Sequence, residues 1–463
     1  MNEILTKFSE IGIIPVVVLN DVGCIIGNSS NHRGGGFFNA VGEEDSERSF
    51  FGTFLMNGGR IDANTAGLID EHQNDGGGVY NVGNFTMNNG CISGNYAAGY
   101  GGGLHTEVMA TINGGRISNN STVRGGGVNN TIDGVLILNG GDIVNNTARK
   151  TGGGVRNCYG DGIGQIPRMY IHGGNISYNS AGLWGGGIIN ADSRLEIDEE
   201  EGKVTISHNT AGVEGGGIEN NDGSTLIIRS GSITDNISHG TGGGIYSYAE
   251  TKVTNLTITG GYIAGNHADD RGGGVHTSFI ADETTVCDLF VSGSPVIKGN
   301  TSGDGIADNV YLEPYDEMGL QRYITLSGNL MSGADIHISY PVGEGEQFGL
   351  ISDGYAATTS DLGYFHADYG SLSAKVTEDK TLVWVKYVKP ASSSSKNEGT
   401  SVWLTAAPTP EPTLTPTPAP TPEVPTVKPT EKPTQTPASP VPLAGLLAGL
   451  GAAFAAAGVC RRK

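Results

Sequence analysis

Short apolar runs alternate with glycine and asparagine along about two-thirds of this chain, and they recur at fixed distances. In residues 176–190, an isoleucine is followed three positions later by asparagine and six positions after that by a glycine triplet. An apolar residue, a variable residue and a small polar residue follow the triplet. Triplets begin at Gly34, Gly76, Gly101, Gly125, Gly152, Gly185, Gly215, Gly242 and Gly272. The asparagines that precede them are Asn28, Asn64, Asn95, Asn120, Asn146, Asn179, Asn209, Asn236 and Asn266.

This repeat predicts an all-β solenoid. Most triplets follow one another at intervals of 24 to 33 residues, which is typical of a repeat architecture. Each repeat holds three short apolar runs, and none has helical spacing over ten or more residues. The interval is too short for a four-stranded propeller blade, which takes about 40 residues. The pattern therefore predicts a parallel β-helix over residues 23–310, with three short strands in each coil and coils about 4.8 Å apart.

Stacked coils place equivalent residues in columns, and the type of residue predicts the direction of each column. The apolar residue after the triplet is predicted to point inward, in a column of Val79, Leu104, Val128, Val155, Ile188, Ile218, Ile245 and Val275. The residue after it is predicted to point outward, where Tyr80, Arg156, Glu219 and His276 can vary without cost. We expect the asparagine at a corner with left-handed backbone, its amide bonded to the asparagines of adjacent coils. The triplet is expected to form another corner, since glycine reaches positive φ without strain.

The composition argues against certain partners and certain kinds of site. The chain has 463 residues, 76 of them glycine, and a net charge of −21 at pH 7. An acidic protein of this kind repels nucleic acid and anionic lipid, so neither is expected as a partner. The cysteines are Cys24, Cys91, Cys158, Cys287 and Cys460. They form no C-x-x-C pair and no Cys/His cluster, so we predict no disulfide framework, no metal site and no cofactor.

Shifts in composition divide the chain into six segments. These are residues 1–22, 23–310, 311–389, 390–442, 443–460 and 461–463. The first is predicted to be an atypical N-terminal cap or a fused segment, and it is a poor secretion signal. Alternating β-branched runs in 311–389 predict a small antiparallel β module that caps the helix. A Ser/Pro/Thr-rich linker, 390–442, then leads to an uncharged stretch, 443–460, and a basic tail. That order predicts a transmembrane anchor with a cytoplasmic tail, and hence display of the β-helix at the cell surface.

The chain resembles the adhesin-like surface proteins of prokaryotes. The resemblance rests on the repeat Asn-x-Ala-x-x-x-Gly-Gly-Gly-(Val/Ile), as in residues 179–188 and 209–218, on the Pro/Thr stalk and on the Pro-Val-Pro-Leu-Ala-Gly…Arg-Arg-Lys tail. It implies a right-handed, pectin-lyase-like parallel β-helix that binds glycans or surface proteins of a host or community. Residues 1–22 instead resemble the start of KDPG-type aldolases in the phrase Glu-Ile-Gly-Ile-Ile-Pro-Val-Val-Val-Leu. This second resemblance implies a fusion or a mis-joined start, and no activity is carried over from it.

The favoured function is non-enzymatic binding, with no residue assigned to catalysis. Aromatic rings stack on sugars and anchor contacts with partners. The candidate contact residues, at or near outward positions, are Tyr96, Tyr100, Trp184, Tyr246 and Tyr248.

The alternative is a polysaccharide lyase or glycoside hydrolase of the same fold. A glycosidase needs two carboxylates about 5–10 Å apart. The candidate acids are Asp235, Asp269, Asp270, Asp304 and Asp308. Ser238-His239-Gly240 superficially resembles a polygalacturonase motif, but the second acidic pair and the basic motif of that family are missing. Binding therefore remains the favoured prediction.

Overall fold

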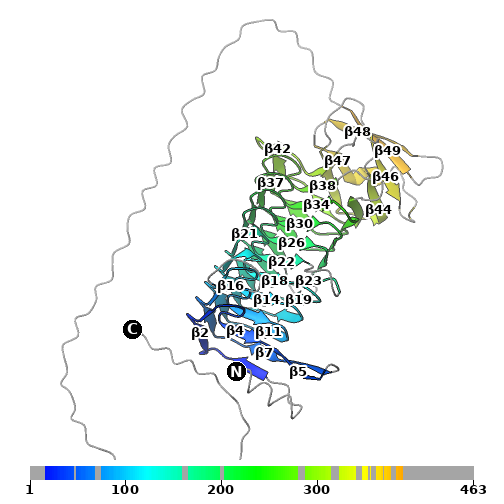
Figure 1. Ribbon diagram of the computed structural model, residues 1–463. Helices are drawn as coiled ribbons and strands as arrows, with labels where there is room; N and C mark the ends of the chain where they lie inside the picture. The colour runs from blue at the N-terminus through cyan, green and yellow to red at the C-terminus, as the bar shows by residue number, and fades with distance from the viewer. Residues whose placement is uncertain are drawn as a thin grey trace, which may run out of the picture. The chain divides into compact units, whose positions relative to one another are not determined.

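The chain folds into a parallel β-solenoid (Figure 1). The computed structural model describes residues 16–45, 48–67, 74–158, 165–198, 203–279, 287–313, 323–339, 347–352, 355, 361–368, 370–376 and 382–388. Within these residues the one helical element is a 3-10 turn, η1 (Asp361–Tyr364). The all-β prediction and the solenoid of about nine turns are confirmed.

Each full coil contributes one strand to each of four sheets. The ten-stranded sheet contains β4 (Phe37–Asn39), β10 (Val79–Asn81), β14 (Leu104–Thr106), β18 (Val128–Asn130), β22 (Val155–Cys158), β26 (Ile188–Ala191), β30 (Ile218–Asn221), β34 (Ile245–Ala249), β38 (Val275–Phe279) and β43 (Val310–Leu312). The fourteen-stranded sheet contains β1 (Val16–Leu19), β7 (Thr53–Met56), β11 (Asn84–Met87), β15 (Met109–Ile112), β19 (Val135–Leu138), β23 (Arg168–Ile171), β27 (Arg194–Ile197), β31 (Thr225–Ile228), β35 (Thr254–Ile258), β39 (Cys287–Gly293), β44 (Tyr323–Leu330), β46 (Gln347–Ser352), β49 (Leu382–Val388) and β48 (Ser371–Val376).

The other two sheets complete the coil. The twelve-stranded sheet contains β2 (Cys24–Ile26), β8 (Arg60–Asp62), β12 (Cys91–Ser93), β16 (Arg116–Ser118), β20 (Asp142–Val144), β24 (Gly174–Ser177), β28 (Val204–Ser207), β32 (Ser232–Thr234), β36 (Tyr262–Ala264), β40 (Val296–Ile297), β45 (Asp335–Ile338) and β47 (Phe365–Ala367). The eleven-stranded sheet contains β3 (Ser29–Ser30), β9 (Thr65–Ala66), β13 (Tyr96–Ala97), β17 (Ser121–Arg124), β21 (Thr147–Thr151), β25 (Ser180–Ala181), β29 (Thr210–Ala211), β33 (Ile237–Ser238), β37 (His267–Ala268), β41 (Thr301–Ser302) and β42 (Ile306–Ala307). A separate antiparallel hairpin joins β5 (Val41–Asp45) and β6 (Arg48–Phe51).

The prediction of three strands per coil was wrong. The additional strand follows the repeated asparagine and is usually only two residues long, as in β25 and β29. Its single inward side chain is usually alanine, such as Ala181 or Ala211, so no apolar run signals it in the sequence.

The predicted inner column of the ten-stranded sheet is confirmed. Its eight residues have no exposed surface, and strand pairing aligns each with the next, as for Val155 with Ile188 and Ile188 with Ile218. A second column, almost entirely isoleucine, lines the twelve-stranded sheet, with Ile176, Ile206 and Ile233 in register. These columns form one continuous apolar core, which supplies the main driving force for stacking.

The three glycines of a triplet have different roles. The first has positive φ, as at Gly185 (65°) and Gly215 (66°). The second and third pass close to the next coil: a Cβ built on Gly186 would lie 2.5 Å from the carbonyl oxygen of Gly216, and one on Gly187 would lie 2.6 Å from that of Gly217. Only glycine fits all three positions, since the first needs left-handed backbone and the others leave no room for a side chain.

The repeated asparagines form a buried ladder, as predicted. In each rung the backbone N–H and Nδ2 donate to Oδ1 of the asparagine in the following coil, with both bonds 3.0 Å long between Asn179 and Asn209. The left-handed backbone, however, lies one residue earlier, for example at Tyr178 (φ 55°) and His208 (φ 56°). The asparagine side chain must point along the stack to bond the adjacent coils. The left-handed turn that directs it there is made by the residue before the asparagine.

The residue after the inner column lies outside the core and varies in type, as predicted, but it is covered rather than exposed to solvent. Tyr80 and Glu219 have no exposed surface and His276 is 3% exposed, while Arg156 is half-buried. The corner formed by the triplet lies against these side chains. A Cβ on Gly215 would be 2.7 Å from the Cβ of Glu219. Residues at this position therefore lie outside the core but are covered by neighbouring backbone and side chains.

The sheets of the solenoid continue into the C-terminal segment. β44 pairs in parallel with β39, and β45 pairs in parallel with β40. Within residues 311–388, the described antiparallel pairs are β46 with β49 and β48 with β49. A separate cap module at 311–389 stays a prediction. In the part of the chain that the structure describes, no helix is long and apolar enough to cross a membrane. The predicted linker, anchor and tail (390–463), and residues 1–15, lie outside the described residues.

Candidate functional site

Two columns of side chains run along the outer face of the ten-stranded sheet. The outer column consists of the residues just after the inner apolar one: Phe38, Tyr80, His105, Asn129, Arg156, Ile189, Glu219, Tyr246, His276 and Tyr311. The corner column consists of the residues just before each triplet: Arg33, Asp75, Tyr100, Arg124, Thr151, Trp184, Glu214, Thr241 and Arg271. The side chains in these two columns differ from coil to coil, whereas the backbone has the same course in each coil. The coils therefore differ chemically on this face.

The N-terminal part of the outer column satisfies its own polar groups. The rings of Tyr80 and His105 stack with centroids 4.7 Å apart, and the Tyr80 hydroxyl donates to Glu107. Asn129 Nδ2 lies 3.1 Å from His105 Nδ1, and Arg156 donates to Asn129 Oδ1 over 2.9 Å. Because each described polar group here has a partner, this stretch stabilises the stack and offers little to a ligand.

The middle of the column differs, because it contains a buried carboxyl without a full set of partners. Glu219 on β30 has no exposed surface. Its Oε1 accepts a 2.9 Å bond from Asn221 Nδ2, but Oε2 has no partner among the described residues. Burial, and then the nearby carboxyl of Glu214, raise the pKa of Glu219 well above its usual range. Burial also raises the pKa of Glu214, which is half-buried.

Other unsatisfied atoms lie in the adjacent coils. Thr241, which is in register with Glu214 in the next coil, has a buried hydroxyl without a partner in the described structure. His276, two coils from Glu219, bonds Glu313 through Nε2 at 2.8 Å, while its Nδ1 has no described partner. Buried polar groups in proteins are nearly always hydrogen-bonded. Three successive coils here each have a buried polar atom without a described partner, so this part of the face is a candidate site.

Three of the five predicted aromatic residues lie around these carboxyl groups. Trp184 precedes Glu214 by one coil in the corner column and is 38% exposed. Tyr246 follows Glu219 by one coil in the outer column and is 6% exposed. Its ring stacks on that of half-buried Tyr248, with centroids 5.9 Å apart. The coils therefore bring aromatic surface to both sides of the acidic pair.

The other two predicted aromatic residues lie elsewhere. Tyr96 is exposed, but it belongs to β13 of the eleven-stranded sheet, on another face. Tyr100 is in the corner column three coils before Trp184, where the guanidinium groups of Arg124 and Arg156 lie 5.4 and 5.0 Å from its ring centroid. Its π-face is thus already in contact with cations.

The acids considered for polysaccharide cleavage are not described as a facing pair. Asp235 is an exposed corner residue with a left-handed backbone (φ 55°). Asp269 is exposed and contacts His239 Nδ1 at 3.0 Å, whereas Asp270 and Asp304 are exposed without a described carboxyl partner. Asp308 is buried, and its Oδ2 accepts a 2.7 Å bond from the Gly272 N–H. Burial raises the pKa of Asp308.

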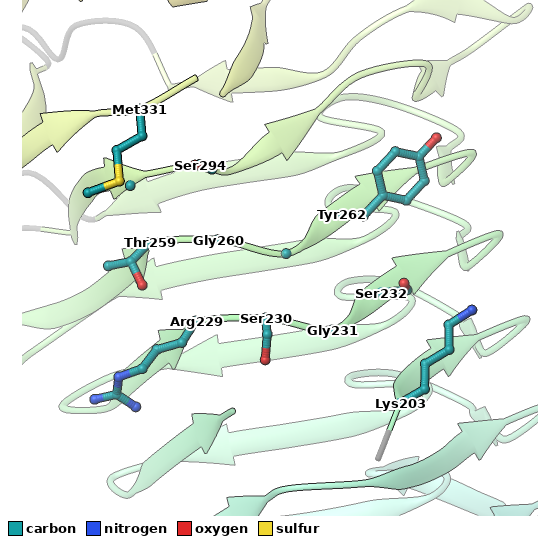
Figure 2. A pocket seen from close by; sticks show the side chains of 12 residues that line it. Lys203, Arg229, Ser230, Gly231, Ser232, Thr259, Gly260, Tyr262, Ser294 and Met331 are labelled. Carbon is teal, nitrogen blue, oxygen red and sulfur yellow. The ribbon is translucent and has the colours of Figure 1, made fainter. Parts of the chain in front are cut away.

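A second candidate surface is a shallow groove between the fourteen- and twelve-stranded sheets, which we call the corner groove. Its volume is about 910 Å³, and its lining comes from successive coils, including Lys203, Arg229, Tyr262 and Met331 (Figure 2). Arg229 is bonded to Glu196 at 2.7 Å, and much of the remaining lining is glycine and serine. The corner groove therefore offers one aromatic ring, Tyr262, but no described buried group without a partner.

The arrangement of the described His, Cys, Asp and Glu side chains bears on a possible metal site. Among the described residues, no group of three or more His, Cys, Asp and Glu side chains is arranged to hold a metal ion, and the four described cysteines form no disulfide.

Comparisons with protein-family models, curated proteins and solved structures find no match to this chain. The resemblances to adhesin-like proteins and to aldolases therefore stay predictions.

The sequence analysis missed Glu214 and Glu219 as site residues. Glu219 is at a position that is predicted to vary without cost, and Glu214 is just before a triplet, where arginine, threonine and other residue types occur without a fixed pattern. The one available signal was that carboxyl groups occupy both variable positions around the triplet at residues 215–217.

Proposed function

We propose that this chain is a cell-surface, non-enzymatic carbohydrate-binding protein whose binding site is the outer face of the ten-stranded sheet around Trp184, Glu214 and Tyr246. The observation that carries the proposal is the exposed ring of Trp184, in register with a half-buried carboxyl that has no described partner. Sugars present apolar ring faces and hydroxyl groups, and sites for them combine aromatic surfaces with fixed polar groups.

The repeated backbone supports binding of an extended ligand. Equivalent positions recur about every 4.8 Å along the stack, so successive coils can contact successive parts of a chain-like glycan. We further infer, from the resemblance in the repeat, a right-handed coil of the adhesin-like type; parallel crossovers are right-handed in nearly all proteins.

A glycan array with the purified full-length chain, followed by affinities for the best ligand, tests this function. Trp184→Ala should weaken binding at least about tenfold, because loss of an aromatic hot-spot residue costs about 2 kcal/mol or more. Tyr262→Ala is the matched control, since Tyr262 is another exposed aromatic residue, in the corner groove. Loss of binding in Tyr262→Ala alone would move the site to the corner groove. Appearance of new reducing ends or unsaturated ends would favour the polysaccharide-cleaving alternative.

The tether is a separate part of the proposal. Residues 443–460 carry no charge and follow a proline-rich stretch at 407–442, which favours a membrane anchor at the end of an extended spacer. Cells that secrete the chain through an added signal peptide should keep it in the membrane fraction and expose the solenoid to added protease. Deletion of residues 443–463 should release it into the medium, and retention of the truncated chain would disprove the tether.

A further inference from the structure

The Glu214–Glu219 pair has the features of a site for a positively charged group. Both carboxyl groups are on the coil that contains the triplet at residues 215–217, one before it in the corner column and one after it in the outer column. The side chain of Glu214 has no described hydrogen bond or ion pair, and the side chain of Glu219 has one described bond, from Asn221. An acceptor that is fully buried and half unsatisfied is costly unless a donor reaches it.

Among the residues that the structure describes, no basic side chain pairs with either carboxyl group. The groups that face Glu219 are Ile189 on β26, Tyr246 on β34, Asn221 on its own strand and Glu214 at the corner. Burial and the carboxyl of Glu214 raise the pKa of Glu219, the bond from Asn221 opposes them, and burial raises the pKa of Glu214. In the free protein the raised pKa means that Glu219 holds its proton to a higher pH than an exposed glutamate does. This protonation removes the cost of a buried charge.

We propose that this pair binds the ammonium group of an amino sugar within a glycan, with the sugar ring against Trp184. The proposal rests on the carbohydrate-binding function above and specifies its ligand class. An ammonium group has three N–H donors and a positive charge. The acceptors offered are Glu214, the unpartnered Oε2 of Glu219 and the unpartnered hydroxyl of Thr241. Trp184, which is exposed, adds an aromatic face that attracts a cation and packs on the sugar ring, while the buried Tyr246 lies beside Glu219 in the next coil.

Binding displaces a proton and requires a small side-chain movement. Glu219 has no exposed atom, so its carboxyl must turn toward Glu214, which is half-buried and is met first by the ligand. The described side-chain hydrogen bond that this movement must break is the one from Asn221. As the ammonium enters, the Glu219 proton leaves to solvent, and the carboxylate pairs with the cation. A calcium ion fits the site less well, because it takes six to eight oxygen ligands.

Two hexasaccharides of equal length separate this inference from the proposed function. The β-1,4-glucosamine hexamer carries ammonium groups, and the N-acetylglucosamine hexamer has the same rings without charge. With the full-length protein, the charged hexamer should bind at least about tenfold more tightly, which corresponds to about 1.4 kcal/mol. Calorimetry in two buffers of different ionisation enthalpy should show a net proton release on binding.

Variants assign the effect to the pair. Glu219→Gln and Glu214→Gln should each remove most of the preference for the charged hexamer, and only Glu219→Gln should abolish proton release. The control Asp304→Asn removes one negative charge from an exposed turn and should keep both. Each variant is first shown to be folded by circular dichroism. If Glu219→Gln fails this check, Glu214→Gln, at the half-buried position, still decides whether the preference depends on the pair.

The outcomes are distinct. Equal binding of both hexamers, or a preference that survives both glutamine variants, overturns the ammonium site but leaves carbohydrate binding intact. A loss of preference in Asp304→Asn as large as in Glu214→Gln would mean that the overall negative charge attracts the cation, and this also overturns the inference. Failure of both hexamers and of every glycan on the array overturns the proposed function as well.

Discussion

Replacing Asn209 by alanine should be among the most damaging single changes to the solenoid. Oδ1 of Asn209 accepts bonds from the backbone N–H and Nδ2 of Asn179, both 3.0 Å long. Nδ2 of Asn209 donates to the Ile176 carbonyl and to Asn236 Oδ1, both at 2.9 Å. The alanine variant loses all four bonds and leaves the buried N–H of Asn179 without an acceptor. An unsatisfied buried group costs about 1–3 kcal/mol and a lost bond about 1 kcal/mol, so we expect a loss of about 4 kcal/mol.

A second asparagine ladder in the same protein provides the control. Asn113 donates to Asn88 and accepts from Asn139, both at 2.8 Å, but these side chains are on the surface. Water can replace those bonds, so Asn113→Ala should cost less than about 1 kcal/mol. Urea unfolding followed by circular dichroism gives the free energies, and amide hydrogen exchange shows whether protection is lost first around the altered coil. Equal costs for the two alanine variants would refute the argument that burial makes the inner ladder essential.

Three further changes test the corners and the buried carboxyl. Gly186→Ala should destabilise the protein by about 3 kcal/mol in the same urea assay, because the new Cβ would lie 2.5 Å from the Gly216 carbonyl oxygen. Ala63→Gly should stabilise it by about 0.5 kcal/mol, because relief of a left-handed alanine (φ 54°) outweighs the greater freedom of the unfolded chain; Ala66→Gly in β9 should destabilise it. Glu219 has a folded-state pKa raised above that of the unfolded chain, so its contribution to stability should decline as pH rises above the unfolded value. The stability of Glu219→Gln relative to the wild type should therefore increase from acidic to neutral pH. A constant difference in unfolding free energy across that range would contradict a raised pKa of Glu219 in the folded protein.

The sequence predicts those features that every coil must repeat. The inner column is visible because each coil needs one large aliphatic residue at that position, as at Ile188 and Ile218. The asparagine ladder is visible for a similar reason, since each rung bonds the next and a coil without it breaks two connections. The short fourth strand is not visible, because one alanine and one small polar residue, as in β29 (Thr210–Ala211), are also typical of a loop.

The candidate site could not be predicted in the same way, because it depends on what one coil does differently from its neighbours. The position of Glu219 holds isoleucine in the preceding coil and tyrosine in the next, and this variation is typical of exposed residues. Its burial arises from the Gly215 corner that lies against its Cβ and from the neighbouring coils, which are distant in sequence. A column can therefore tolerate many residue types and still be buried, provided that each side chain finds partners in the adjacent coils. In the described structure one oxygen of the Glu219 carboxyl group has no such partner, and for this reason we propose its coil, rather than an N-terminal one, as the site for a ligand.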